Sequence, residues 1–179
     1  IGNKINLPFP SVGATENILM AASIAKGKTT IFNAAMEPEI SDLAHSLNKM
    51  GAKISIEKKG VIKIKGVEKL YQASHKIMSD RIVAGTFVIA AVMLNKKFLV
   101  KDINPNHLVA LTSVLNKMGA ELQIKPNSIQ ILPSKSLKGV KIQTAPYPGF
   151  PTDLQAQIMV LMSIVNGNSQ IRENIFENR

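Results

Sequence analysis

Apolar residues follow two spacings along the chain, one typical of helices and one typical of strands. Helical spacing occupies residues 12–25, 39–50, 80–94, 106–118 and 152–165. Short alternating or β-branched runs occupy residues 29–32, 52–56, 61–64, 98–101, 121–124, 128–132 and 169–172, and strands leading into the later units are expected at 76–78 and 140–143. The pattern predicts an α/β protein.

The hexapeptide LNKMGA occurs at residues 47–52 and returns unchanged at residues 115–120, 68 positions later. In both places it closes a predicted helix with a glycine and leads into a predicted strand. This period is too long for one rung of a solenoid and fits a compact unit of several helices and strands. We therefore predict a repeated β-α-β-α-β-β unit, present about two and a half times.

The boundary between domains is expected in the segment 66–79, where the apolar periodicity breaks between the two fuller copies. This predicts one domain over residues 1–78 and a second over residues 79–179. The chain opens with Ile1 rather than methionine and stops partway through the third copy, so we interpret it as an internal fragment.

The composition is that of a globular protein, with 45% hydrophobic residues and a mean hydropathy of +0.10. No apolar run approaches the roughly 18 residues of a membrane span, and no signal peptide is visible. Cysteine is absent, which fits a reducing compartment, and we expect a cytoplasmic bacterial protein without membrane contact.

The net charge of +10 raises the possibility of nucleic-acid binding. However, the lysines are distributed along the chain, and aromatic residues make up only 4%, too few for a base-stacking platform. A solvated basic surface is the favoured interpretation, although a basic α/β RNA-binding module and a purely structural repeat domain remain alternatives. The three histidines have no metal-ligand spacing, so no metal site is expected.

Two predicted helix starts carry candidate chemistry. Ser11, Val12 and Gly13 open the first helix, where free backbone N–H groups and the helix dipole favour a phosphate. An ordinary serine N-cap explains the same residues. Asp153 stands at the start of the last predicted helix, where it could act as a base toward a hydroxyl or simply cap the helix. Asp80 and Arg81 occupy the corresponding position in the second copy.

The chain ends with IFENR, residues 175–179, in which Arg179 could grip a phosphate or carboxylate with two hydrogen bonds. An ion-paired turn is the alternative interpretation. Because the copies place different polar groups at equivalent helix starts, we predict that these starts face one shared electropositive cleft.

Together, the LNKMGA pair and five further strings resemble the enolpyruvyl transferase family, and in particular its UDP-N-acetylglucosamine branch. The five strings are SVGATEN (11–17), EPEISDLA (37–44), SDRIVAGTF (79–87), PGFPTDLQAQ (148–157) and IFENR (175–179). The resemblance covers nearly the whole chain in the same order. It is weaker toward the 3-phosphoshikimate 1-carboxyvinyltransferases, which remain an alternative.

The resemblance implies an inside-out α/β barrel of six β-α-β-α-β-β units, with the last unit of one domain in residues 1–78. It implies transfer of enolpyruvate from phosphoenolpyruvate to the 3′-hydroxyl of UDP-N-acetylglucosamine, the first committed step of peptidoglycan synthesis, without a metal or organic cofactor. The residues implied to bind the sugar nucleotide are Phe9, Pro10, Ser11, Val12, Gly13, Ile175 and Phe176. Asp153 is the implied general base, and Arg179 is expected to hold it in place.

Two positions depart from the family pattern. Phe9 stands where many relatives carry a basic residue, and Val83 stands where an acidic one is common. The resemblance also places the family's catalytic loop, with a cysteine or aspartate as acid, outside this chain. We therefore expect the chain alone to be inactive.

Overall fold

The computed structural model describes residues 1–177 and divides the chain into two compact units. Unit 1 is Ile1–Met78, and unit 2 begins at Ser79. Each unit has its own cluster of buried apolar side chains.

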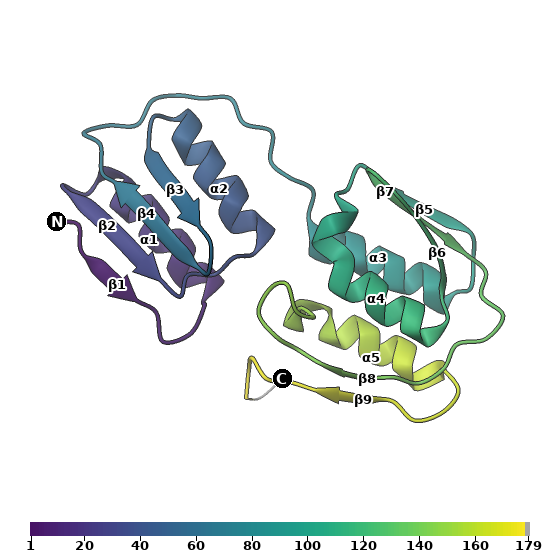
Figure 1. Cartoon of the computed structure of the whole chain (residues 1–179). Helices are drawn as coiled ribbons and strands as arrows, with labels where there is room; N and C mark the ends of the chain where they lie inside the picture. Colours follow the sequence, from purple (N-terminus) through teal and green to yellow (C-terminus); the bar gives the residue numbers. More distant parts are fainter. Residues whose placement is uncertain (178–179) are drawn as a thin grey trace. The chain divides into compact units, whose positions relative to one another are not determined.

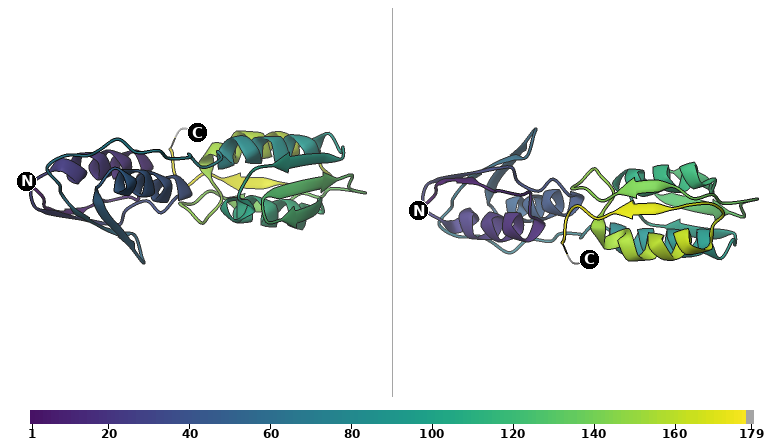
Figure 2. Two further views of the ribbon diagram at one scale, coloured as in Figure 1. Left: turned by 90° about the horizontal axis from the view of Figure 1, so that it is seen from above. Right: turned by 90° about the horizontal axis from the view of Figure 1, so that it is seen from below.

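Unit 1 is a four-stranded sheet covered by two helices that lie together on one of its faces (Figures 1 and 2). Its sheet has the order β1-β2-β4-β3, with β1 parallel to β2 and the other pairs antiparallel. The elements are β1 (Lys4–Asn6), α1 (Val12–Ile24), β2 (Lys28–Phe32), α2 (Pro38–Lys49), β3 (Lys53–Glu57) and β4 (Val61–Lys65).

Side-chain alternation along β4 explains why only one face of this sheet is covered. Ile62 and Ile64 are buried, whereas Lys63 and Lys65 between and after them are exposed. A strand directs successive side chains to opposite faces, so the isoleucines face the helices and the lysines face water. The core beneath the helices is formed by Leu19, Ala22, Ile31, Ala34, Ala35, Ile40, Leu47, Ala52, Ile62 and Ile64.

The repeated hexapeptide forms the same helix ending in both units. Gly51 and Gly119 adopt left-handed backbone angles, with φ of +100° and +96°. The following amides, of Ala52 and Ala120, donate to the carbonyls of Leu47 and Leu115 at 3.0 Å in each case. Only glycine adopts this conformation without a steric cost, and the two leucines are buried. The hexapeptide is therefore a helix-ending signal with its own apolar anchor.

Unit 2 places its three α-helices between two sheets (Figure 1). One sheet has the antiparallel order β5-β7-β6, and the other is the parallel pair β8-β9. The elements are α3 (Arg81–Met93), β5 (Phe98–Lys101), η1 (Pro105–Leu108), α4 (Val109–Met118), β6 (Glu121–Lys125), β7 (Ser128–Leu132), β8 (Lys141–Gln143), η2 (Thr152–Leu154), α5 (Gln155–Ile164) and β9 (Gln170–Arg172).

The order of elements confirms the predicted repeat. Unit 1 runs β-α-β-α-β-β, and the stretch from α3 to β7 repeats it without the leading strand. The sheet order β5-β7-β6 corresponds to β2-β4-β3, and the parallel pair β8-β9 with α5 between them corresponds to β1, α1 and β2. The predicted α/β class is therefore correct, and the repeat can be followed through two and a half copies.

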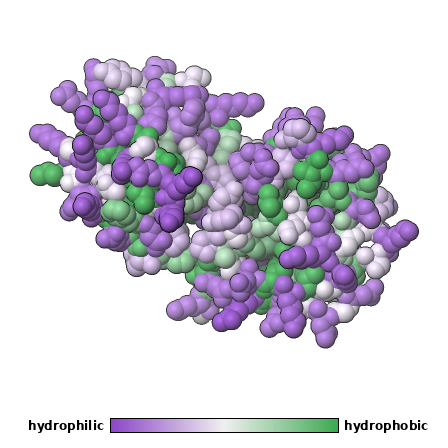
Figure 3. Space-filling view, in the orientation of Figure 1, coloured by the Kyte–Doolittle hydropathy of each residue, from purple (hydrophilic) through white to green (hydrophobic). Residues whose placement is uncertain are grey.

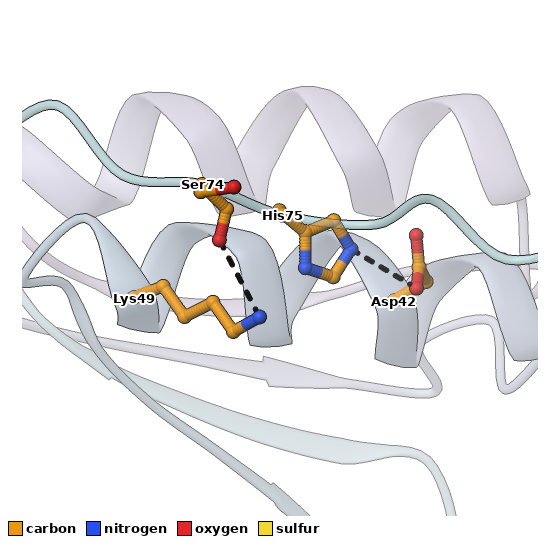
Figure 4. A network of polar contacts seen from close by, with 4 residues as sticks. All are labelled: Asp42, Lys49, Ser74 and His75. Atoms are coloured by element: carbon orange, nitrogen blue, oxygen red, sulfur yellow. Dashed lines mark hydrogen bonds and ion pairs between the residues drawn. The ribbon is translucent and has the colours of Figure 1, made fainter.

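The strand expected at residues 76–78 is wrong. Residues 66–80, between β4 and α3, contain no helix or strand and form an irregular strap. The strap instead follows α2 (Figure 4). His75 Nε2 lies 3.1 Å from Asp42 Oδ1, and Lys49 Nζ donates to the Ser74 carbonyl at 3.5 Å. A strand forms where its backbone N–H and C=O groups pair with a neighbouring strand. The strap instead makes these polar contacts with α2.

Two predicted helices begin as 3₁₀ turns, and one strand was not predicted. The helix expected at 106–118 starts with η1, and the helix expected at 152–165 starts with η2. Pro105 and Pro151 stand at these starts, where a missing N–H is tolerated. The short β1 has too few residues for a period-two pattern to be recognised.

Hydrophilic side chains cover much of the face in Figure 3, with smaller hydrophobic areas among them. They are spread over both units on this face, which agrees with a solvated surface. Among residues 1–177, no helix is long and apolar enough to cross a membrane.

Packing at Gly85 in α3 generates a test of the unit 2 core. A Cβ added there would lie 2.7 Å from Leu154 Cδ1 and 3.2 Å from Leu111 Cδ2, and both leucines are fully buried. We expect Gly85→Ala to lower the free energy of unfolding by about 1 kcal/mol, because overpacking outweighs the gain in helix propensity.

Gly13→Ala is the matched control, because a Cβ on this helical glycine would meet nothing within 4 Å. It should leave stability unchanged or raise it by up to about 1 kcal/mol. Thermal unfolding of the two variants measures both effects. A Gly85→Ala variant as stable as the parent would contradict the packing argument.

Candidate functional site

Ser11 is the N-cap of α1, as its sequence position predicts. Its backbone is extended, and its Oγ accepts a hydrogen bond from the Ala14 amide at 3.3 Å. The first turn of α1 carries no acidic residue, so the partial positive charge of the helix start is not offset locally. The serine cap and an anion-binding helix start are compatible, because capping satisfies only some of the terminal N–H groups.

Side-chain hydrogen bonds hold the start of α1 in place. Thr15 is fully buried, and its hydroxyl donates to the Ser11 carbonyl at 2.8 Å while accepting from the Ala35 amide at 3.0 Å. Asn33, which follows β2, donates through its side chain to the Leu7 carbonyl at 2.9 Å. These bonds tie the loop before α1 to the ends of two strands.

The other predicted residues of unit 1 surround this start. Phe9 is 43% exposed and Gly13 is exposed, whereas Pro10, Ser11 and Val12 are half-buried. A Cβ at Gly13 would meet nothing, so the backbone there is open to a ligand. Structurally, all five residues form one continuous edge at the amino end of α1.

Asp153 lies in the 3₁₀ turn η2, immediately before α5. Its side chain is exposed, while the neighbouring Leu154 is fully buried and fixes the turn to the core. The N-cap residues of η2 and α5 are Pro151 and Leu154, so Asp153 occupies neither N-cap position. Asp153 lines an open pocket of about 350 Å³ together with Thr152, Gln155, Ala156, Gln157 and Met159.

Sequence reasoning missed Glu173, which the structure places against Ile175 and against Thr152, the residue that precedes Asp153. Its carboxylate accepts hydrogen bonds from the hydroxyl of Thr144 at 2.9 Å and from the hydroxyl of Thr152 at 2.9 Å. It also accepts from the backbone amides of Ile175 and Phe176, at 2.6 and 3.1 Å. One side chain thus joins the turn before α5 to the turn after β9.

The ionised form of Glu173 is favoured by this arrangement. Burial opposes ionisation, but the hydrogen bonds from Ile175, Thr152, Thr144 and Phe176 outweigh it and lower the pKa of Glu173 below its ordinary value. A carboxylate that accepts several hydrogen bonds is stabilised in its charged form. Glu173 therefore acts as a fixed anion at neutral pH.

Ile175 and Phe176 lie in the turn that Glu173 organises. Ile175 is half-buried, and Phe176 is 54% exposed. The structure thus brings Asp153, Ile175 and Phe176 together at one end of the β8-β9 pair. Arg179, the remaining predicted residue, lies outside the described residues.

Asp80 and Arg81, whose role the sequence left open, have structural partners in unit 2. Asp80 caps α3 by accepting from the amides of Ile82 and Val83 at 2.7 and 3.0 Å. Arg81 is buried, with its guanidinium carbon 5.9 Å from the centre of the Tyr147 ring. Val83 is exposed, so the acidic side chain missing there would have faced outward.

Across residues 1–177, no group of three or more His, Cys, Asp or Glu side chains could hold a metal ion. The structure gathers candidate polar groups at two places: the open start of α1 in unit 1, and the exposed Asp153 next to the buried Leu154 in unit 2.

Comparison with known proteins shows which proteins this chain resembles. The family model of EPSP synthase (3-phosphoshikimate 1-carboxyvinyltransferase) matches residues 2–179. A UDP-N-acetylglucosamine 1-carboxyvinyltransferase of Prochlorococcus marinus (strain MIT 9312) is 56% identical over 178 residues, which is 99% of this chain and 39% of the relative. UDP-N-acetylglucosamine 1-carboxyvinyltransferase 1 of Clostridium perfringens is 50% identical over 181 residues, 99% of this chain and 43% of the relative. The chain thus spans about two fifths of these relatives.

Solved structures show the same fold. The enolpyruvyl transferase NikO from Streptomyces tendae matches with a TM-score of 0.86 at 22% identity, over 98% of this chain and 45% of that one. EPSP synthase from Acinetobacter baumannii matches with a TM-score of 0.66 at 20% identity, over 95% of this chain and 40% of that one. At these identities the likeness establishes the partial enolpyruvyl transferase fold and not the substrate.

The repeat, the fold and the family match over residues 2–179 lead to one conclusion: the chain belongs to the EPSP synthase (3-phosphoshikimate 1-carboxyvinyltransferase) family.

Proposed function

We propose that the protein containing this chain transfers the enolpyruvyl group of phosphoenolpyruvate to the 3′-hydroxyl of UDP-N-acetylglucosamine and releases phosphate. The observation that carries the proposal is the exposed carboxylate of Asp153 beside an open pocket, in a chain whose curated relatives at 49–56% identity bear the name of that activity. The reaction would be the first committed step of peptidoglycan synthesis in the cytoplasm, and would thereby serve cell-wall formation, cell shape and division.

In this proposal Asp153 is the general base. It accepts the proton of the 3′-hydroxyl as that oxygen bonds to C2 of phosphoenolpyruvate, while C3 gains a proton and a tetrahedral adduct forms. The bond from C2 to the phosphate oxygen then breaks, a proton leaves C3, and the enolpyruvyl ether results. The resemblance assigns the acid to a loop that this chain does not contain.

Each unit of the chain supplies binding residues in the proposal. The open start of α1, with Phe9, Pro10, Ser11, Val12 and Gly13, binds the uridine and diphosphate, because backbone N–H groups and the helix dipole favour an anion. In unit 2, Ile175 and Phe176 contact the sugar nucleotide, and Arg179 holds Asp153 and the reacting groups.

Placing the base on a 3₁₀ turn that leads into α5 suits this role. Leu154 is buried and Thr152 is bonded to Glu173, so the backbone on both sides of Asp153 is fixed. General bases act best when they are held within hydrogen-bond distance of the proton they remove.

A second candidate activity is transfer to shikimate 3-phosphate, favoured by the family model and by the fold match to EPSP synthase. The curated relatives favour the sugar nucleotide, because they share about half of all positions with this chain. Membership of this family also favours an enzyme over an RNA-binding module.

The choice of acceptor can be tested on the full-length protein with phosphoenolpyruvate and either acceptor. We expect phosphate release and a carboxyvinyl product with UDP-N-acetylglucosamine, detected colorimetrically and by mass spectrometry, and no product with shikimate 3-phosphate. Product from shikimate 3-phosphate alone would reverse the assignment.

The role of Asp153 predicts the effect of removing its charge. In the full-length protein, Asp153→Asn should lower kcat by about 100- to 10,000-fold while binding of UDP-N-acetylglucosamine persists, because proton transfer is lost and the fold is kept. Asp102→Asn is the control, since Asp102 is an exposed residue in a turn of the same unit. Turnover by Asp153→Asn at the rate of the control would remove Asp153 from the mechanism.

A further inference from the structure

Four hydrogen-bond donors from three separate segments converge on the carboxylate of Glu173. Thr144 follows β8, Thr152 opens η2, and Ile175 and Phe176 lie in the turn after β9. Oε1 accepts from three of them and Oε2 accepts from Thr152. A carboxylate has about four lone-pair positions, two on each oxygen, so Oε1 is fully used by these bonds and Oε2 accepts one bond from Thr152.

The connection at Thr144 extends beyond Glu173. Thr144 is fully buried, and while its hydroxyl donates to Glu173 it also accepts from the Asn174 amide at 2.9 Å. The Asn174 side chain donates to the Thr144 carbonyl at 3.2 Å, and the Thr144 amide donates to the Arg172 carbonyl at 2.9 Å. The end of β8 is therefore hydrogen-bonded to the end of β9, and Glu173 lies between the two residues, Arg172 and Asn174, that make these bonds.

Three of the four contacts of Glu173 belong to the proposed site or directly adjoin it. Thr152 directly precedes Asp153, and its hydroxyl is 2.9 Å from Oε2. Ile175 and Phe176 are themselves proposed contacts of the sugar nucleotide, and their amides donate to Oε1. A shift of Glu173 would therefore move the base and the nucleotide contacts relative to each other.

Charge matters for this arrangement. All four partners donate to Glu173, so a side-chain amide in its place would remove the negative charge and would set an NH₂ group either against the two backbone amides or against the Thr152 hydroxyl, which would then have to turn and accept. A buried or partly buried donor left without its acceptor costs stability and is relieved by movement of the backbone. An ionised carboxylate is the side chain that satisfies all four at once.

We propose that Glu173 is a positioning residue that sets the geometry between Asp153 and the Ile175–Phe176 turn without touching the substrate. This inference rests on the proposed function, because it assigns a purpose to the clamp around the proposed base. Catalytic groups misplaced by about 1 Å lose on the order of 100-fold in rate.

The test is steady-state kinetics of the full-length protein carrying Glu173→Gln. We expect kcat to fall about 10- to 100-fold and KM for UDP-N-acetylglucosamine to rise several-fold, with KM for phosphoenolpyruvate unchanged. A loss of folded protein would lower the apparent kcat alone, so the unequal change in the two KM values reports positioning. Glu121→Gln, at an exposed position of unit 2, makes the same change in charge and should behave as the parent.

A second pair of variants keeps the test decisive if Glu173→Gln folds poorly. Thr144→Val removes the hydroxyl with little change in volume, whereas Thr144→Ser keeps it. We expect Thr144→Val to show the same pattern of kinetic change in milder form and Thr144→Ser to restore kcat to near the parent value.

The outcomes separate the two proposals. An inactive parent protein would overturn the proposed function itself. An active parent with unchanged kinetics in Glu173→Gln, or with equal kinetics in the two Thr144 variants, would overturn the positioning role and leave the proposed function standing.

The lowered pKa of Glu173 also predicts how its contribution to stability depends on pH. A carboxyl group whose pKa is depressed on folding stabilises the folded state above its ordinary pKa of 4.5, and that stability is lost as the pH falls through the lowered value. The four donors are uncharged and do not titrate there. The loss of thermal stability caused by Glu173→Gln should thus be largest near neutral pH and shrink below about pH 4. A difference in Tm that stays constant from pH 7 to pH 3 would contradict this.

Discussion

Parallel pairing between the strand before a helix and the strand after it is the constraint on which this structure depends. Parallel neighbours cannot be joined by a tight turn, so the chain crosses over through a helix, as α1 does between β1 and β2 and α5 does between β8 and β9. The carboxyl ends of both strands then lie at the same edge of the sheet. Whatever follows each strand is therefore brought together there, and this edge holds the candidate residues of each unit.

In unit 1 this edge joins the loop before α1 to Asn33, and in unit 2 it joins Thr144 to Glu173. The two edges are held differently. Unit 1 uses a neutral amide that bonds a backbone carbonyl, whereas unit 2 uses an ionised carboxylate that collects four donors. A charged clamp resists distortion more strongly than a neutral one, which fits the unit in which the proposed base is located.

Much of the fold could be predicted from sequence because its signals are local. The repeated hexapeptide encodes a helix ending through Gly51 and Gly119, and β5 and β7 have the predicted bounds. The strand expected at 76–78 failed because strand formation depends on a partner, and the strap bonds α2 instead. The site was predictable where one residue suffices, as in the Ser11 cap. Glu173 was not, because its importance arises from donors 29 and 21 residues away in sequence.

The three helix starts show how one scaffold can carry different chemistry. Ser11 and Asp80 both turn their side chains back to cap α1 and α3, so each is occupied by its own helix. At the third start, proline and a 3₁₀ turn take the place of a side-chain cap, and Asp153 is exposed at the rim of a pocket. Solved structures at 20–22% identity share the fold of this chain, so the same backbone accommodates sequences that differ at most positions. The short polar segments at these starts are then where acceptor choice and proton transfer can differ while the repeated unit stays the same.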